Sequence, residues 1–122
     1  MRLLPHIDIK YRADVLGEDQ LVGAVDALIE VVAKHFQEKP EFVSLEISAQ
    51  NRVVRNRKAV DIEIDSSPDP EGVRARAVGA LSEELAAVLG AHLEREGFHG
   101  TEISAWVRVF TAGAYQYHRT AG

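Results

Sequence analysis

Three short stretches of this sequence occur twice, in the same order, once in each half of the chain. Asp8-Ile9 matches Asp61-Ile62, residues 24–28 match residues 77–81, and residues 46–49 match residues 102–105, at offsets of 53, 53 and 56 residues. The change in offset falls in a connection between elements, where insertions are best tolerated. Because the matches are collinear, we predict an internal repeat of residues 5–50 and 59–110. A chain of 122 residues is the size of one domain, which we expect to span residues 1–122.

Helical periodicity predicts one helix in each half. The first helix is expected over residues 21–36, with its apolar stripe at Leu21, Val25, Leu28, Ile29, Val32 and Phe36. The second helix has a start signal, since Asp69 can cap it and Pro70 suits its first position. Its apolar stripe consists of Val78, Leu81, Leu85, Val88 and Leu89, and Gly97 suits its C-terminal end. Each helix is therefore expected to bury one face.

Four segments alternate between apolar and polar residues, as half-buried β-strands do. Their apolar positions are Ile7, Ile9 and Tyr11; Val43, Leu45, Ile47 and Ala49; Val60, Ile62 and Ile64; and Ile103, Ala105, Val107 and Val109. If the helices cover this apolar face, the opposite face is polar and includes Trp106 among charged residues. Two interpretations of the polar face stay open. It is either a solvated surface or an oligomer interface, and Trp106 favours the interface.

The alternating elements predict a two-layer α/β (α+β) subunit built from a duplicated β-α-β unit. Its four-stranded mixed sheet is expected to be parallel within each half and antiparallel between halves, with both helices on one face. A ferredoxin-like arrangement is the alternative, because it has the same order of elements. In that arrangement a third strand separates the two strands of each half.

The composition argues against several classes of function. The chain has no cysteine, which excludes disulfides and thiol chemistry and makes a reducing, cytoplasmic location the expectation. Fourteen basic and nineteen acidic residues give a formal charge of −5, which disfavours nucleic acid as a partner. Neither a signal peptide nor a membrane span is expected. The five histidines are scattered without ligand-like spacing, so we expect no metal site and no cofactor.

Two further segments concentrate side chains of one kind. The connection between the halves carries Arg52, Arg55, Arg57 and Lys58. This connection is either a solvated loop or a basic segment whose arginines hold a small carboxylate-containing molecule through paired hydrogen bonds. The tail carries Tyr115 and Tyr117, which we interpret as an aromatic arm that docks on a neighbouring subunit.

Residues 5–11, PHIDIKY, resemble the opening of the tautomerase superfamily, and the resemblance extends, with decreasing clarity, over nearly the whole chain. The length is similar to that of 5-carboxymethyl-2-hydroxymuconate isomerase. Residues 60–77, VDIEIDSSPDPEGVRARA, and the tyrosine-containing tail are more similar to an uncharacterised tautomerase-like branch. The resemblance implies a homotrimer of β-α-β subunits. It also implies a cofactor-independent keto-enol tautomerase or isomerase that acts on small 2-oxo or 2-hydroxy acids.

The resemblance makes Pro5 the expected catalytic residue, because the family uses the secondary amine of an N-terminal proline as a general base. In this sequence Pro5 follows residues 1–4, so its nitrogen is an amide without a basic lone pair. Three accounts stay open. In the first, residues 1–4 are retained and Pro5 has no catalytic role. In the second, translation starts at position 4 and the initiator methionine is removed, which leaves Pro5 at the N-terminus. In the third, a protease cuts before Pro5.

The resemblance also suggests substrate-binding positions, namely Arg12, Glu46 and Arg52. An arginine of the family's second strand falls near Glu46 here, which reverses the charge expected to hold a substrate carboxylate. Arg12, just beyond the first strand, and Arg52 in the loop are the candidate replacements. Two alternatives to an enzyme remain at this point. One is a non-catalytic oligomeric or small-ligand-binding protein on the same fold, and the other is a ferredoxin-like regulatory module.

Overall fold

A single sheet and a layer of helices make up the part of the chain that the computed structural model describes, residues 4–50 and 58–110. The elements are β1 (His6–Arg12), α1 (Glu18–Val22), α2 (Val25–Phe36), a 3-10 turn (Pro40–Phe42), β2 (Ser44–Gln50), β3 (Val60–Ser66), α3 (Val73–Arg95) and β4 (Ile103–Val109). All four predicted strands and the second predicted helix are present. The Tyr115/Tyr117 arm and most of the basic connection, including Arg52, lie outside the described residues.

The strand order decides between the two predicted topologies. The sheet runs β2-β1-β3-β4. Strand β1 is parallel to β2, β3 is parallel to β4, and β1 and β3 are antiparallel neighbours. The two strands of each half are therefore adjacent, as predicted for a duplicated β-α-β unit. The ferredoxin-like alternative is wrong, because it requires a third strand between them.

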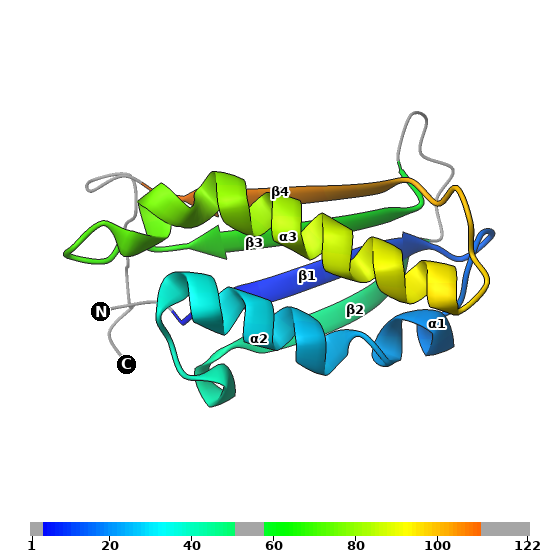
Figure 1. The fold of residues 1–122 in the computed structure, drawn as a ribbon, viewed down its shortest axis with the longest axis horizontal. Helices are drawn as coiled ribbons and strands as arrows, with labels where there is room; N and C mark the ends of the chain where they lie inside the picture. The colour runs from blue at the N-terminus through cyan, green and yellow to red at the C-terminus, as the bar shows by residue number, and fades with distance from the viewer. Residues whose placement is uncertain (1–3, 51–57, 111–122) are drawn as a thin grey trace, which may run out of the picture.

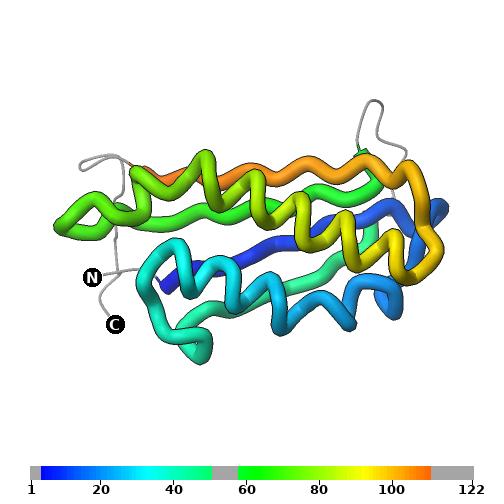
Figure 2. The backbone as a smooth tube through the Cα atoms, viewed as in Figure 1, coloured from blue at the N-terminus to red at the C-terminus, as the bar shows by residue number. Residues whose placement is uncertain are grey.

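The helices lie together on one face of the sheet, with α2 over β1 and β2 and α3 over β3 and β4 (Figure 1). The tube in Figure 2 shows the same path in each half: a strand, a return through the helical layer, and a second strand beside the first. Within the described residues no helix is both long enough and apolar enough to cross a bilayer.

The first predicted helix is divided into α1 and α2, and a residue from α3 explains the break. The ring of His92 donates from Nε2 to the backbone carbonyl of Gln20 at 2.8 Å. The amide of Ala24 bonds to the carbonyl of Leu21 at 3.0 Å, one position short of the α-helical partner. Between them lies Gly23, where an added Cβ would sit 2.8 Å from Cε1 of His92. At the break, the carbonyl of Gln20 therefore bonds to His92 instead of to the amide of Ala24, and Gly23 leaves room for the ring.

Replacing Gly23 with alanine is expected to lower the free energy of unfolding by about 1–2 kcal/mol, because the new methyl group overlaps the ring of His92. The backbone itself does not require glycine there, since φ is −64°. Gly79→Ala in α3 is the matched control. A Cβ at Gly79 meets nothing within 4 Å, so we expect a gain of about 0.5–1 kcal/mol. Urea unfolding followed by circular dichroism measures the free energy of unfolding of both variants. If both substitutions change it in the same direction, the steric explanation is wrong.

The second helix starts later than predicted, with Gly72 instead of Asp69 as its N-cap residue and Pro70 before the helix, although the Asp69 side chain does cap the first amides. Helix α3 begins at Val73, after Gly72 in the left-handed conformation at φ 70°. The carboxylate of Asp69 accepts hydrogen bonds from the amides of Val73 at 3.0 Å and Arg74 at 2.8 Å. Burial by itself would raise the pKa of Asp69, but these amides outweigh it and the pKa is lowered.

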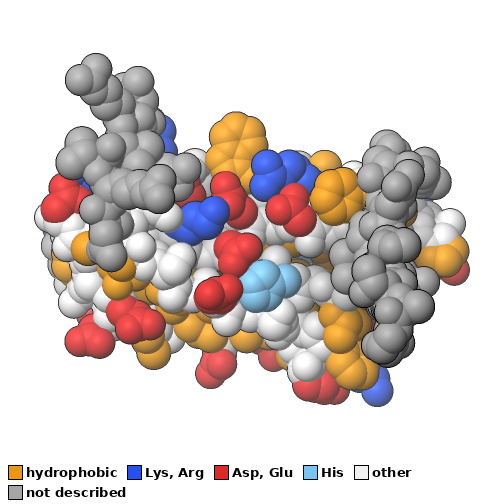
Figure 3. All heavy atoms as spheres, turned by 180° about the vertical axis from the view of Figure 1, so that it is seen from behind, with side chains coloured by type: hydrophobic (Ala, Val, Ile, Leu, Met, Phe, Trp, Pro, Cys, Tyr) orange, Lys and Arg blue, Asp and Glu red, His pale blue; other side chains and the backbone are white. Residues whose placement is uncertain are grey.

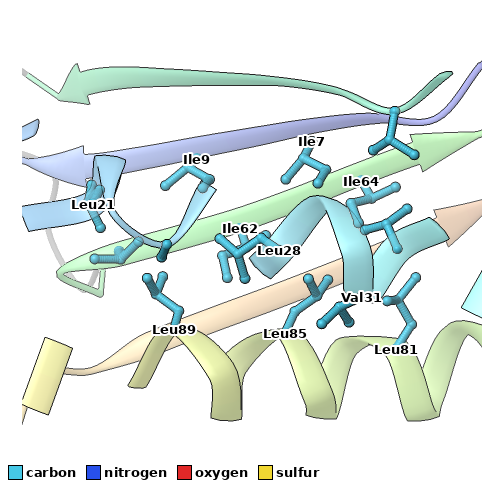
Figure 4. Close-up of a cluster of buried hydrophobic side chains, with 14 of the residues drawn as sticks. Ile7, Ile9, Leu21, Leu28, Val31, Ile62, Ile64, Leu81, Leu85 and Leu89 are labelled. Carbon is cyan, nitrogen blue, oxygen red and sulfur yellow. The ribbon is translucent and has the colours of Figure 1, made fainter. Parts of the chain in front are cut away.

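The core lies between the sheet and the helices, as Figure 4 shows. The isoleucines of the two central strands, Ile7, Ile9, Ile62 and Ile64, are all fully buried. They face Leu28 and Val31 of α2 and Leu81, Leu85 and Leu89 of α3. The period-two and helical stripes in the sequence thus identified the two surfaces that meet.

Candidate functional site

The sheet face opposite the helices is the polar face that the sequence predicted (Figure 3). Strand register aligns its side chains in three rows from β2 to β4. The rows are Ser44, His6, Asp65 and Arg108; Glu46, Asp8, Glu63 and Trp106; and Ser48, Lys10, Asp61 and Ser104. Figure 3 shows acidic side chains gathered near the middle of this face, beside a histidine. We call these twelve residues the open face.

Ion pairs neutralise part of the acidic charge on the open face. Lys10 donates from Nζ to Glu63 at 3.0 Å. Arg108 makes two hydrogen bonds to the carboxylate of Asp65, at 2.7 and 3.2 Å, and these bonds raise the pKa of Arg108. The hydroxyl of Ser104 donates to Asp61. These contacts tie β1 to β3 and β3 to β4 across the open face.

A histidine and two carboxylates converge at the remaining part of the open face. Nε2 of His6 lies 3.1 Å from a carboxylate oxygen of Asp8 and 3.7 Å from one of Glu46. Nδ1 of the same ring lies 2.6 Å from the hydroxyl of Ser44. Asp8 and Glu46 face each other in the parallel register of β1 and β2. We call His6, Asp8 and Glu46 the triad.

The triad is a candidate site that the sequence analysis did not predict. His6 and Asp8 are two residues apart on one strand, so they point to the same face, but Glu46 is distant in the chain. Only the register between β1 and β2 brings Glu46 beside Asp8. Aligning the two predicted parallel strands would have placed Glu46 beside Asp8. The spacing of histidines along the sequence does not reveal this pairing.

Pro5 lies immediately before β1, one of the two central strands of the sheet. It is buried, and its carbonyl oxygen accepts a hydrogen bond from the amide of Ser44 at 3.1 Å. The preceding residue, Leu4, is 52% exposed. The Pro5 nitrogen is part of the peptide bond to Leu4, so in this form it carries neither a proton nor a basic lone pair.

Of the predicted substrate-binding residues, Arg12 and Glu46 lie in the described part of the chain, and they do not converge on Pro5 within this subunit. Arg12 is the last residue of β1 rather than a residue beyond it, about 20 Å along the strand from its start. Its guanidinium bonds to Asp14 at 2.7 and 3.2 Å, and this hydrogen bonding lowers the pKa of Asp14. Glu46 is closer to the Pro5 end of the sheet, but its side chain belongs to the triad. The roles of Arg12 and Glu46 stay predictions.

Comparison with family models and with curated proteins finds no match to this sequence. Solved structures do match. A 5-carboxymethyl-2-hydroxymuconate isomerase from Deinococcus radiodurans R1 has a TM-score of 0.64 at 17% identity, over 96% of this chain and 90% of that one. A macrophage migration inhibitory factor-like protein from Entamoeba histolytica has a TM-score of 0.61 at 17% identity, over 96% and 97%. A fused 4-OT described as a symmetric trimer has a TM-score of 0.61 at 13% identity, over 92% and 90%.

The chain has the tautomerase fold. The matched structures cover nearly the whole chain, so the fold extends over both β-α-β halves. Identities of 13–17% establish the fold and leave the chemistry to be argued from residues. In the tautomerase fold of this chain, Pro5 immediately precedes the first strand, and His6 of the triad is the first residue of that strand.

Proposed function

We propose that this protein is a self-associating member of the tautomerase superfamily. We propose further that it catalyses cofactor-independent keto-enol tautomerisation of small 2-oxo or 2-hydroxy acids when Pro5 is its N-terminal residue. The observation that supports this proposal is the position of Pro5, which lies immediately before β1, a central strand of a sheet with the tautomerase fold.

The chemistry depends on the bonding of the Pro5 nitrogen. A terminal proline has a secondary amine that can accept a proton from the carbon beside a carbonyl and return it elsewhere on the same substrate. Such an isomerisation is balanced without a cofactor. An internal proline nitrogen is an amide and cannot carry a proton in this way. The proposed activity therefore requires a chain that begins at Pro5.

Two measurements test the proposal together. Intact mass and N-terminal sequencing of the protein from its native host determine whether Pro5 is terminal. The ketonisation rate of the enol of a 2-oxo acid is then compared between chains with and without residues 1–4. A native chain that keeps residues 1–4 and shows no turnover would contradict the enzymatic proposal.

A non-catalytic oligomeric or small-ligand-binding protein is the second candidate, and the triad favours it. Glu46 lies near the position where the family resemblance implies an arginine that holds a substrate carboxylate, and Asp8 beside it adds a second negative charge. The amide bond between Leu4 and Pro5 is compatible with this candidate, because it needs no proline amine.

Self-association through the open face is part of both candidates. Trp106 is 57% exposed at the end of the central row of the open face, and large aromatic side chains are enriched at interfaces. The fused 4-OT with the same fold is described as a symmetric trimer. We propose a homotrimer, and we propose a cytoplasmic location because the chain lacks cysteine.

Trp106→Glu is expected to convert the trimer to monomers, because it places a fourth carboxylate in the row of Glu46, Asp8 and Glu63. Sedimentation equilibrium should give about 40 kDa for the original protein, three times the 13.4 kDa chain, and 13.4 kDa for the variant. Val22→Glu is the control, since Val22 is 53% exposed on α1 in the helical layer. A monomeric original protein at micromolar concentration would contradict the trimer.

A further inference from the structure

We propose that the triad, His6, Asp8 and Glu46, binds a divalent first-row transition-metal ion, with Zn²⁺ as the reference ion. Each residue offers one ligand atom, and the three atoms lie within 4.8 Å of one another. The proposal goes beyond the tautomerase activity and does not depend on whether Pro5 is terminal.

The spacing of the ligand atoms is close to what a bound ion needs. Zn²⁺ lies about 2.0–2.2 Å from imidazole nitrogen and carboxylate oxygen, which places neighbouring tetrahedral ligands about 3.4 Å apart. The corresponding distances from Nε2 of His6 are 3.1 Å to Asp8 and 3.7 Å to Glu46. A rotation of the exposed Glu46 side chain is enough to complete the set.

Ser44 contacts the other ring nitrogen of His6, so a polar partner lies behind the candidate metal ligand. Nδ1 of His6 lies 2.6 Å from the hydroxyl oxygen of Ser44. Without a metal ion, both ring contacts are satisfied when Nε2–H donates to Asp8 at 3.1 Å and the Ser44 hydroxyl donates to Nδ1. A metal ion would take the place of the Nε2 proton, and Nδ1–H would then donate to the Ser44 hydroxyl. A polar partner of this kind is usual for a metal-bound histidine.

The negative charge around the triad also favours the binding of a cation. Glu46, Asp8 and Glu63 are adjacent in one row, and like charges opposite each other destabilise a sheet. Lys10 neutralises Glu63. Within residues 4–50 and 58–110, no lysine or arginine lies within ion-pair distance of Asp8 or Glu46. A divalent ion would neutralise both carboxylates at once.

The chemistry of the ligand set selects the class of ion. One imidazole nitrogen with two carboxylate oxygens suits Zn²⁺, Mn²⁺, Fe²⁺ or Co²⁺. Ca²⁺ is a poor fit because it prefers six or more oxygen ligands. Three protein ligands leave at least one position for water or for a small anion. An ion bound there would attract carboxylate ligands to the open face, whereas the negative charge of Glu46 alone repels them.

Isothermal titration of the metal-free full chain with ZnCl2 tests the site, and Co²⁺ absorption in the visible range reports its coordination. We expect one Zn²⁺ per chain, with binding lost in His6→Ala and at least about tenfold weaker in Glu46→Gln. Ser44→Ala should weaken binding about 10–100-fold, because it releases the ring of His6. Ser48→Ala is its matched control on the same strand and face, and His99→Ala controls for an exposed histidine elsewhere.

Either of two results would overturn the proposal. One is the absence of Zn²⁺ binding up to about 1 mM, which would mean that the triad is not a metal site. The other is binding that survives His6→Ala and Glu46→Gln, which would place the ion elsewhere. Circular dichroism of each variant confirms that the fold is kept, so loss of binding is assigned to the ligand.

Discussion

A chain that begins at Pro5 is expected to convert the enol of a small 2-oxo acid to its keto form at least about 100-fold faster than the chain that keeps residues 1–4. A positioned general acid or base contributes about 10²–10⁴ in rate, and the two chains differ in whether the Pro5 nitrogen can act as one. Enols conjugated to an aryl group absorb in the ultraviolet, so the loss of absorbance measures the rate directly.

Two controls separate the chemistry of Pro5 from the effect of shortening the chain. Adding one alanine before Pro5 restores the amide while removing most of the extension, and it should abolish the gain. Pro5→Ala at the N-terminus keeps an amine but changes it from secondary to primary, and it should lower the rate. If the Pro5 chain assembles normally and all forms ketonise the substrate equally slowly, Pro5 is not a base. The non-catalytic candidate would then stand.

The strands, the helical layer and their buried faces were predictable because two independent patterns in the sequence agree. Alternation places the isoleucines at 7, 9, 62 and 64 on one face of two strands, and helical stripes supply leucines to cover them. Collinear matches between the halves imply that the same β-α-β unit is built twice, but the ferredoxin-like arrangement has the same order of elements, so only the observed strand order decides between the two. Local propensity and global pattern point the same way, and such agreement is a mark of foldable sequences.

The features that escaped prediction depend on contacts between distant residues. Gly23 lies inside a continuous helical stripe, and nothing nearby in the sequence signals that His92 will take its space. The triad required the register of β1 against β2. An arginine in the first turn of a helix would ordinarily be solvated, yet Arg74 is fully buried. In each case the partner is more than 30 residues away.

Arg74→Met is expected to lower the free energy of unfolding by about 3–5 kcal/mol, the usual cost of removing one partner from a buried ion pair. Arg74 donates to Glu38 at 3.1 Å, to the hydroxyl of Ser66 at 2.8 Å and to the carbonyl of Ser67 at 3.2 Å. Its guanidinium also stacks 5.4 Å from the ring centre of Phe36. Methionine fills the volume but makes none of these hydrogen bonds, so Glu38 would keep its charge, largely buried, without this arginine.

A second substitution distinguishes the buried charge from lost packing. In Arg74→Met combined with Glu38→Gln the carboxylate is gone, so part of the loss should be recovered. Arg76→Met is the matched control on the same helix, where the exposed guanidinium donates to the carbonyl of Glu71, and it should change stability by less than about 0.5 kcal/mol. Urea unfolding at one fixed protein concentration measures all three, since assembly makes stability depend on concentration. If Arg74→Met and Arg76→Met lower the free energy of unfolding by the same amount, the buried pair of Arg74 and Glu38 does not stabilise the fold. The contact between the end of α2 and the start of α3 would then contribute nothing to holding the two halves of the helical layer together.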